Sequence, residues 1–214
     1  MLYKQTTTPF LFETLENLMQ WQELQNFRLV GGTGLSLQLG HRQSIDIDLF
    51  TDVEFNIQDL ARMIKKRIPE SEIRILSFGL TIYISTSKSM NLKIDLMETD
   101  KYIRPEIIIE GIRFAHIEDI AAMKLEAITS RNTKKDFYDI AELLNHYTID
   151  QLFSFYVERY PYNDIKQVLE NFTFFSEDCE LEFEPYSLNN TDWLSVKFLL
   201  IDSFNDYVNR QLKG

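Results

Sequence analysis

The feature that most constrains the fold is an alternating segment that carries two aspartates two positions apart. Residues 44–50 predict a strand, and Asp46 and Asp48 project from the same face of it because side chains alternate along a strand. Two carboxylates on one face repel each other, and a bound divalent cation removes that repulsion. The alternatives are an edge strand with a solvated acidic face, or a helix-capping aspartate. The opposite, apolar face is predicted to carry Ile45, Ile47 and Leu49.

A glycine pair comes shortly before this segment. Residues 27–30 predict a short strand that enters a tight turn at Gly31 and Gly32, and residues 33–39 predict a short helix. Glycine lets the backbone approach a ligand closely, and a helix N-terminus presents unpaired N–H groups that suit phosphate. Thr33 adds a hydroxyl that can bond a phosphate oxygen. A plain structural turn is the alternative interpretation.

A third carboxylate lies in another strand-like run, residues 92–97. Asp95 is flanked there by Ile94 and Leu96, so it is predicted to stand on the opposite face from them. If this strand neighbours the strand of Asp46, three carboxylates converge, which is the number that a two-metal phosphoryl-transfer site commonly needs. We therefore expect two Mg²⁺ ions at these carboxylates, with Mn²⁺ as a substitute. The alternative for Asp95 is a surface position.

Two cations and an aspartate form a second candidate group. Lys124 and Arg131 stand seven positions apart at the predicted helix 117–130, so they share a face and are placed to clamp phosphates. A solvated basic face is the alternative. Asp136 lies at the start of a predicted helix over residues 134–147. It is expected to line an acceptor site, to pair with a cation or to cap the helix.

The remaining polar residues can each be interpreted in more than one way or are expected to be structural. Arg42 stands between the glycine turn and the aspartate strand, where it reaches a phosphate or forms a local salt bridge. Lys134 and Lys135 add to a basic cluster with Arg131. We expect structural roles for His41, His116 and Cys179.

The 214 residues divide into two parts that differ in their predicted secondary structure. The predicted fold class is α/β (α+β), with a mixed sheet flanked by helices over residues 1–115 and a helical domain over 116–214. No linker rich in Pro, Gly or Ser separates them, so we expect them to pack together. Further strands are predicted over residues 72–78, 80–85, 107–109 and 112–114, and further helices from Pro9, over 56–68 and over 192–212.

Charge is distributed unevenly along the chain. The formal charge is −11, from 22 bases and 33 acids. Residues 142–214 hold 13 acids and 5 bases, which leaves −3 for residues 1–141. If metal ions balance the three strand carboxylates, the first part is neutral. Any RNA is therefore expected near residues 131–135, with the acidic tail facing away or meeting a basic partner.

Composition narrows the class of protein. One cysteine excludes a disulfide framework, and three histidines far apart in sequence argue against a zinc site. No run of about 18 apolar residues and no signal-peptide core occurs, so we expect a cytoplasmic protein without membrane contact, and a monomer.

The two candidate groups together resemble a known family. Gly31-Gly32-Thr33 followed by Asp46-Ile47-Asp48-Leu49 is similar to the signature of the polymerase-β-type nucleotidyltransferases, and the whole of residues 31–50 resembles the AbiEii/AbiGii toxin family within that superfamily. The downstream block 123–140 resembles the same family's lysine helix, arginine and KD-x-x-D motif. The resemblance covers about residues 25–145. Departures are Gly34, where alanine is more typical, and Thr33, where serine is commoner.

This resemblance implies an activity and roles for the residues. It implies transfer of a nucleoside monophosphate from an NTP to an acceptor hydroxyl, such as that of tRNA, by the toxin of a toxin–antitoxin or phage-defence (abortive infection) pair. An antitoxin encoded nearby is implied as a partner. By resemblance, Asp46, Asp48 and Asp95 hold the metal ions, Gly31, Gly32 and Thr33 cradle phosphates, Lys124 and Arg131 neutralise the triphosphate, and Asp136 serves the acceptor.

Other functions remain possible at this point. The same chemistry fits a small-molecule acceptor, as in aminoglycoside nucleotidyltransferases, or a protein hydroxyl. A nucleotide-binding module without turnover and a fold used only for protein contact belong to different classes.

Overall fold

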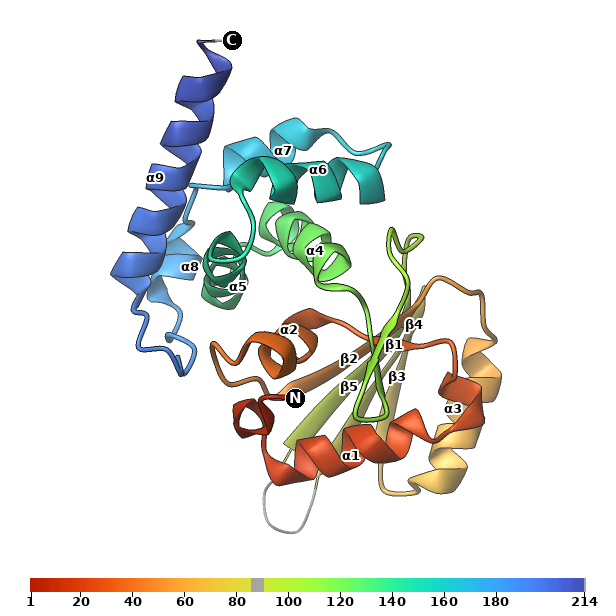
Figure 1. Cartoon of the computed structure of the whole chain (residues 1–214). Helices are drawn as coiled ribbons and strands as arrows, with labels where there is room; N and C mark the ends of the chain where they lie inside the picture. Colours follow the sequence, from red (N-terminus) through yellow and green to blue (C-terminus); the bar gives the residue numbers. More distant parts are fainter. Residues whose placement is uncertain (86–90, 214) are drawn as a thin grey trace. The chain divides into compact units, whose positions relative to one another are not determined.

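A computed structural model describes residues 1–85 and 91–213, so the last residue of the predicted helical domain lies outside it. The chain divides into two compact units (Figure 1), which we call the sheet unit and the helical unit. The sheet unit comprises residues 1–40 and 44–116, and the helical unit comprises residues 41–43 and 117–214.

The segment His41–Gln43 is assigned to the helical unit, which the sequence does not predict. Backbone hydrogen bonds explain the assignment. The Leu188 amide donates to the His41 carbonyl at 2.8 Å, and the Gln43 amide donates to the Tyr186 carbonyl at 2.9 Å. The three residues therefore form part of the framework of the helical unit, although the chain on either side of them folds into the sheet unit.

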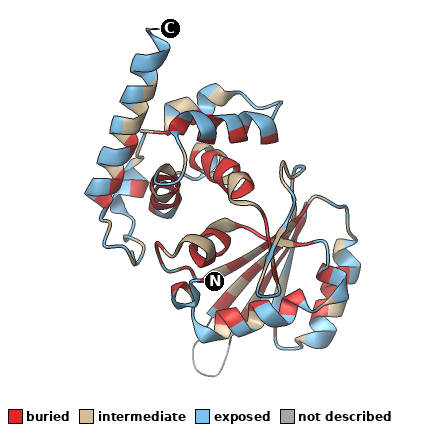
Figure 2. Cartoon of the chain, viewed as in Figure 1, coloured by how far each residue is buried: buried red, intermediate tan, exposed pale blue. Residues whose placement is uncertain are grey.

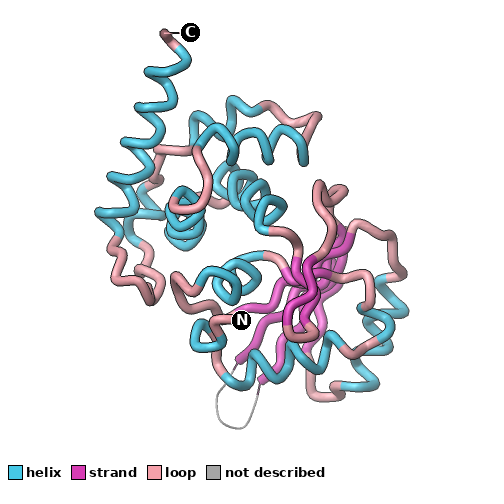
Figure 3. The backbone as a smooth tube through the Cα atoms, in the orientation of Figure 1, coloured by secondary structure: helices cyan, strands magenta, loops and turns pink. Residues whose placement is uncertain are grey.

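The sheet unit is built on one mixed sheet (Figure 3). Within the described residues, seven strands follow the order β3-β4-β5-β2-β1-β7-β6. Neighbours β2 and β5 run parallel, as do β1 and β7, and the other pairs are antiparallel. The strands are β1 (Arg28–Leu29), β2 (Asp46–Thr51), β3 (Glu72–Leu76), β4 (Gly79–Ser85), β5 (Asn91–Glu98), β6 (Ile107–Ile109) and β7 (Ile112–Phe114).

One face of this sheet is the core of the unit. Buried and part-exposed residues alternate along β2 and β5 (Figure 2), as the period-two pattern predicts. Helices α1 (Pro9–Met19) and α3 (Ile57–Arg67) supply buried leucines and isoleucines to the same core. Ile45 is an exception: it lies just before β2 and is 69% exposed, so its predicted place on the apolar face is wrong. The strand begins one residue later, at Asp46.

Side-chain caps set the helix starts in this unit. The Thr8 hydroxyl accepts the Leu11 amide at 3.2 Å ahead of α1, and Pro9 follows at the first turn. The Asn56 side chain accepts the Asp59 amide at 3.0 Å ahead of α3. Short helical turns lie at η1 (Lys4–Thr6) and η2 (Gln22–Leu24), and α2 spans Gly31–Leu39.

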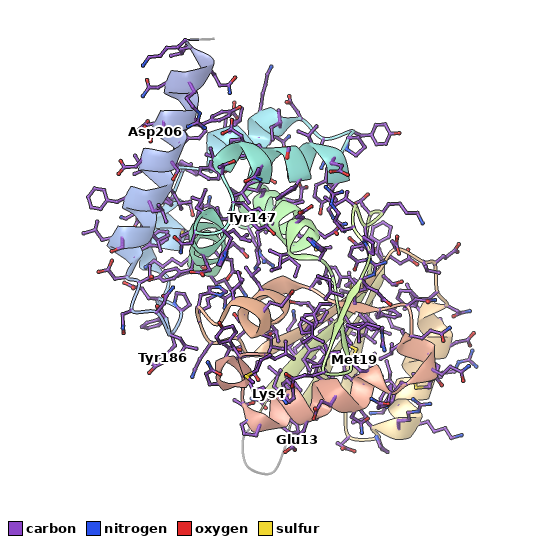
Figure 4. The ribbon with its side chains drawn as sticks, viewed as in Figure 1. Lys4, Glu13, Met19, Tyr147, Tyr186 and Asp206 are labelled. Atoms are coloured by element: carbon purple, nitrogen blue, oxygen red, sulfur yellow. The ribbon has the colours of Figure 1, made fainter. Side chains whose placement is uncertain are left out.

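The helical unit has an aromatic core. Trp193 packs edge-on against Phe175 at 5.2 Å and stacks on Tyr138 at 6.2 Å, and Phe153 meets Phe172 edge-on at 5.3 Å. Tyr186 and Asp206 instead lie on the exposed surface of this unit (Figure 4). The helices are α4 (Ile117–Ser130), α5 (Lys134–Leu144), α6 (Ile149–Arg159), α7 (Ile165–Asn171), α8 (Glu177–Leu181) and α9 (Trp193–Gln211).

The predicted fold class is confirmed: a mixed sheet with flanking helices precedes a set of helices. Within the described part of the chain, none of the helices combines the length and the apolar composition that crossing a membrane requires.

Candidate active site

Three acidic residues occupy neighbouring positions on the face of the sheet opposite the core. Asp46 and Asp48 alternate with buried Ile47 and Leu49 along β2. In the parallel pairing of β2 with β5, Asp48 stands in register with Asp95, and Asp46 stands in register with Lys93. Both strands thus present acidic residues side by side, which is the arrangement that the sequence predicts if the strands are neighbours.

The turn at Gly31 lies directly against one of these carboxylates. The Val30 amide donates to the Asp48 carbonyl at 2.9 Å, which brings the start of α2 beside β2. Gly31 has a φ of +66°, and a Cβ added to it would lie 2.0 Å from Asp48 Oδ2. Glycine is therefore required here twice, for its backbone conformation and for the space that the carboxylate occupies.

Thr33 forms internal hydrogen bonds and does not lie on the surface of this turn. It is fully buried, its hydroxyl donates to the Asp46 carbonyl, and it lies 2.8 Å from the Ser44 hydroxyl. The predicted bond from this hydroxyl to a phosphate is at odds with that geometry, because a hydroxyl has one proton to donate. Thr33 instead ties the first turn of α2 to the start of β2. The capacity of this turn to bind an anion rests on its backbone N–H groups.

Asp95 is held by two side chains that the sequence analysis did not single out. Lys93 Nζ lies 2.5 Å from Asp95 Oδ2, and the Thr81 hydroxyl donates to Asp95 Oδ1 at 2.7 Å. Partial burial by itself would lower the pKa of Lys93, but the bond and the charge of Asp95 outweigh it and raise that pKa, with Asp48 and Asp46 adding to the rise. The signal in the sequence is that Lys93 precedes Asp95 by two positions, on the same face of β5.

The chemistry of these donors suits a hard divalent cation. Carboxylate oxygens are the ligands that Mg²⁺ prefers, and Asp46, Asp48 and Asp95 supply them. In the portion of the chain that the structure describes, no three His, Cys, Asp or Glu side chains are grouped as a ready metal-binding set. Each oxygen of Asp95 accepts one hydrogen bond, from Lys93 or from Thr81. The three residues fit the ion in kind, and the Lys93 ammonium is a cation that already occupies part of the Asp95 carboxylate.

The helical unit contains a buried group of opposite charges. Asp136, in the first turn of α5, accepts four hydrogen bonds. Its Oδ1 accepts from Lys124 at 2.9 Å and from Arg131 at 2.7 Å, and its Oδ2 accepts from Arg131 at 2.6 Å and from the Thr133 hydroxyl at 2.8 Å. Of the roles predicted for Asp136, the structure shows the pairing with cations, and these donors fill the carboxylate. Its role at an acceptor site stays a prediction.

Asp139, one turn further along α5, is surrounded in the same way. Arg42 donates to both of its oxygens, at 2.7 and 2.8 Å, and Lys124 Nζ lies 2.6 Å from Oδ2. His41 Nε2 donates to Oδ1 at 2.7 Å, since an ionised carboxylate can only accept. Arg42 forms a salt bridge, but its partner Asp139 is 97 positions away in the sequence rather than local as predicted.

These pairings control the ionisation of the group. Burial alone would raise the pKa of both carboxyls, but the cations outweigh it: Lys124 and Arg131 hold the pKa of Asp136 below its ordinary value, and Arg42 and Lys124 do so for Asp139. Burial would likewise lower the pKa of Lys124, and the two carboxylates raise it instead. Asp136, Asp139 and Lys124 are therefore charged across the physiological range.

The cations that the sequence assigns to phosphate binding differ in how far their side chains are exposed. Lys124 and Arg42 are 3% and 4% exposed, whereas the Arg131 side chain is 51% exposed. Lys134 is buried and donates to the Glu180 and Glu182 carbonyls at 3.1 and 2.7 Å, so it does not belong to a basic surface. The exposed members of the predicted basic cluster are Arg131 and Lys135.

Known proteins resemble this chain in sequence and in fold. An uncharacterized protein of Aquifex aeolicus is 30% identical over 182 residues, covering 81% of this chain and 87% of the relative. The structure of JHP933 from Helicobacter pylori is 20% identical, with a TM-score of 0.55 and coverage of 98% of this chain and 96% of that one. The nucleotidyltransferase toxin MenT4 from Mycobacterium tuberculosis is 13% identical, with a TM-score of 0.54 and coverage of 91% and 82%.

The two structural likenesses establish the fold, and a family match establishes the relationship. The profile described as nucleotidyl transferase AbiEii toxin of a type IV toxin–antitoxin system matches residues 14–161. That span includes the glycine turn, the carboxylate strands and the buried charge group. Because it covers more than half of the chain, this protein belongs to the AbiEii family of nucleotidyltransferase toxins.

Proposed function

We propose that this nucleotidyltransferase carries a nucleoside monophosphate from an NTP to a hydroxyl of an RNA, such as tRNA, in a reaction that depends on divalent metal ions. One observation in the sheet unit carries the proposal. Asp46 and Asp48 share a face of β2, Asp48 stands in register with Asp95, and the turn at Gly31 lies against the Asp48 carboxylate. A metal-ligating face thus adjoins a helix start suited to phosphate.

Each of these residues has a part in the proposed reaction. Asp46 and Asp48 hold Mg²⁺, two ions in all, and Asp95 contributes the third carboxylate. The N–H groups of Gly31 and Gly32 at the first turn of α2 bind the outer phosphates. Bound metal would polarise the α-phosphate and neutralise the leaving pyrophosphate. The acceptor oxygen attacks the α-phosphorus in line with the bond that breaks.

The buried charges of the helical unit act indirectly in this proposal. Asp136 and Asp139 fix Lys124 and Arg42, and Arg131 keeps half of its side chain exposed. We assign contact with substrate phosphate to Arg131 and a positioning role to the aspartates.

The RNA acceptor rests on the toxin family and on local charge. Arg131 and Lys135 are exposed in the helical unit, while most of the excess acid lies after residue 141. Because the family is that of a toxin–antitoxin system, we also propose an antitoxin encoded nearby as partner.

Label transfer tests the proposal. The protein is incubated with Mg²⁺, total RNA and each α-labelled NTP in turn, beside Asp46→Asn, Asp48→Asn and the exposed control Asp59→Asn. We expect label on RNA with the wild type and the control, and its loss in both β2 variants. If the wild type transferred label equally well with and without EDTA, that result would count against the metal role.

The same assay separates the alternatives. Label on an added aminoglycoside or on protein, in place of RNA, would identify a different acceptor. Tight nucleotide binding with no pyrophosphate release from any NTP would indicate a binding module without turnover.

A further inference from the structure

A lysine stands within the acidic face of the sheet unit. Lys93 is in register with Asp46 and lies two positions from Asp95 on β5, so its side chain is on the same face as all three carboxylates. Its ammonium reaches Asp95 at 2.5 Å, and Asp48 and Asp46 act on it electrostatically. Lys93 is thus the cation that is paired with Asp95.

We infer that Lys93 is a built-in counter-charge that pairs with Asp95 when no metal is bound and competes with the divalent ion for its carboxylate. The inference rests on the metal-dependent function proposed above. In the metal-free protein the ammonium supplies a counter-charge to Asp95. When the ion binds, Asp95 exchanges the ammonium for the metal.

The charge beside Asp95 favours this exchange. Each oxygen of Asp95 accepts one bond, from Lys93 or from Thr81, and keeps a lone pair for an ion, but the ammonium 2.5 Å from Oδ2 repels a divalent ion that approaches the same oxygen. The hydroxyl of Thr81 is neutral and opposes a cation little, whereas the charge of Lys93 repels it.

The side chain of Lys93 is able to leave. It is 40% exposed, in contrast to the buried Lys124 of the helical unit, and its four-carbon stem moves the ammonium without a change in the backbone. Lys93 therefore sets the metal affinity, and its loss leaves the donor atoms in place. Replacing a residue that merely supports the fold would weaken metal binding. Replacing Lys93 is expected to strengthen it, so the two roles predict opposite changes in metal affinity.

Mn²⁺ binding measured by calorimetry on the full chain tests the inference. We expect Lys93→Met to bind Mn²⁺ about tenfold more tightly than the wild type, because a unit charge beside a divalent ion is removed. Lys93→Arg keeps the charge and should retain the wild-type affinity. Lys66→Met, which removes an exposed lysine from α3, controls for the change in net charge.

Thermal melting in EDTA provides a second readout that involves no metal. Without its counter-charge the acidic face is repulsive, and Lys93→Met is expected to melt about 2–4 °C below the wild type. Adding Asp95→Asn to Lys93→Met should restore part of that loss.

The outcomes distinguish this inference from the proposed function. Equal or weaker Mn²⁺ binding by Lys93→Met, relative to Lys66→Met, would overturn the role of Lys93 while leaving the metal site intact. If the wild type bound no Mn²⁺ and matched an Asp46→Asn variant, the metal site itself would be refuted, and the inference with it.

Discussion

Replacing Gly31 with alanine should damage the site far more than it damages the fold. The substitution adds a single methyl group at a residue whose φ is +66°. An L-residue held in the left-handed region costs about 1–2 kcal/mol of stability. Gly111 offers a matched control, because its φ is +82° and a Cβ added there meets no atom within 4 Å. Gly111→Ala should therefore show the backbone cost alone.

The collision at Gly31 is with the side chain of Asp48. The added Cβ would lie 2.0 Å from Asp48 Oδ2, against an ordinary contact distance of at least 3.4 Å, so that oxygen has to retreat by about 1.4 Å. Rotation of the carboxylate relieves this contact, but the added Cβ would also lie 2.9 Å from Asp48 Cγ and 3.1 Å from its Cβ, so Asp48 has to move as a whole, at a further cost in stability. A displacement of about 1 Å in a reacting group costs about 100-fold in rate, however, so the larger loss should fall on activity.

Two measurements separate these effects. Urea unfolding is expected to give a larger free-energy loss for Gly31→Ala than for Gly111→Ala, because only the first has to move Asp48, and label transfer to RNA should fall about 100-fold in the first only. If Gly31→Ala transferred label as fast as Gly111→Ala, the contact with Asp48 would not be what shapes the site. Equal free-energy losses in the two variants would contradict the argument that Asp48 has to move.

Two further predictions concern buried polar groups. Thr33→Val should lower the free energy of unfolding by about 1–3 kcal/mol, because the buried Asp46 carbonyl loses its donor, and Thr33→Ser should recover most of it in urea titrations. An unchanged midpoint for the valine variant would refute that bond. The helical unit should lose stability as the pH falls below about 4. The pKa values of Asp136 and Asp139 lie below those of the unfolded chain, which takes up protons first, so their contribution is present above that range and lost beneath it. Unfolding curves followed by helical circular dichroism that were identical at pH 7 and pH 3 would contradict this.

Much of the sheet unit was predictable because its signals are local. The alternation of Asp46 to Phe50 indicated a strand and a polar face, and the helical spacing of residues 56–68 indicated the helix that the structure has at Ile57–Arg67. The helix over residues 117–130 has the bounds that its spacing predicts. These features depend on periodicity and on hydrogen bonds between near neighbours, which a sequence displays directly.

The parts that the sequence did not reveal are contacts between distant residues. Nothing near Lys124 shows that its ammonium lies between two aspartates twelve and fifteen positions later, because the turn between α4 and α5 decides that. The burial of Thr33 follows from the approach of α2 to β2. Lys93 was overlooked because a lysine on a half-exposed strand is ordinary until the register with Asp46 is known.

The assignment of residues 41–43 to the helical unit bears on how the chain can be divided. A cut after residue 116 would leave Arg42 on one fragment and its partner Asp139 on the other. The second fragment would keep Asp139 buried with Lys124 but without its bidentate guanidinium, and breaking such a pair costs about 3–5 kcal/mol. The helical unit is thus discontinuous in sequence: Arg42, which lies between the turn at Gly31 and the strand of Asp46, completes the charge balance around Asp139.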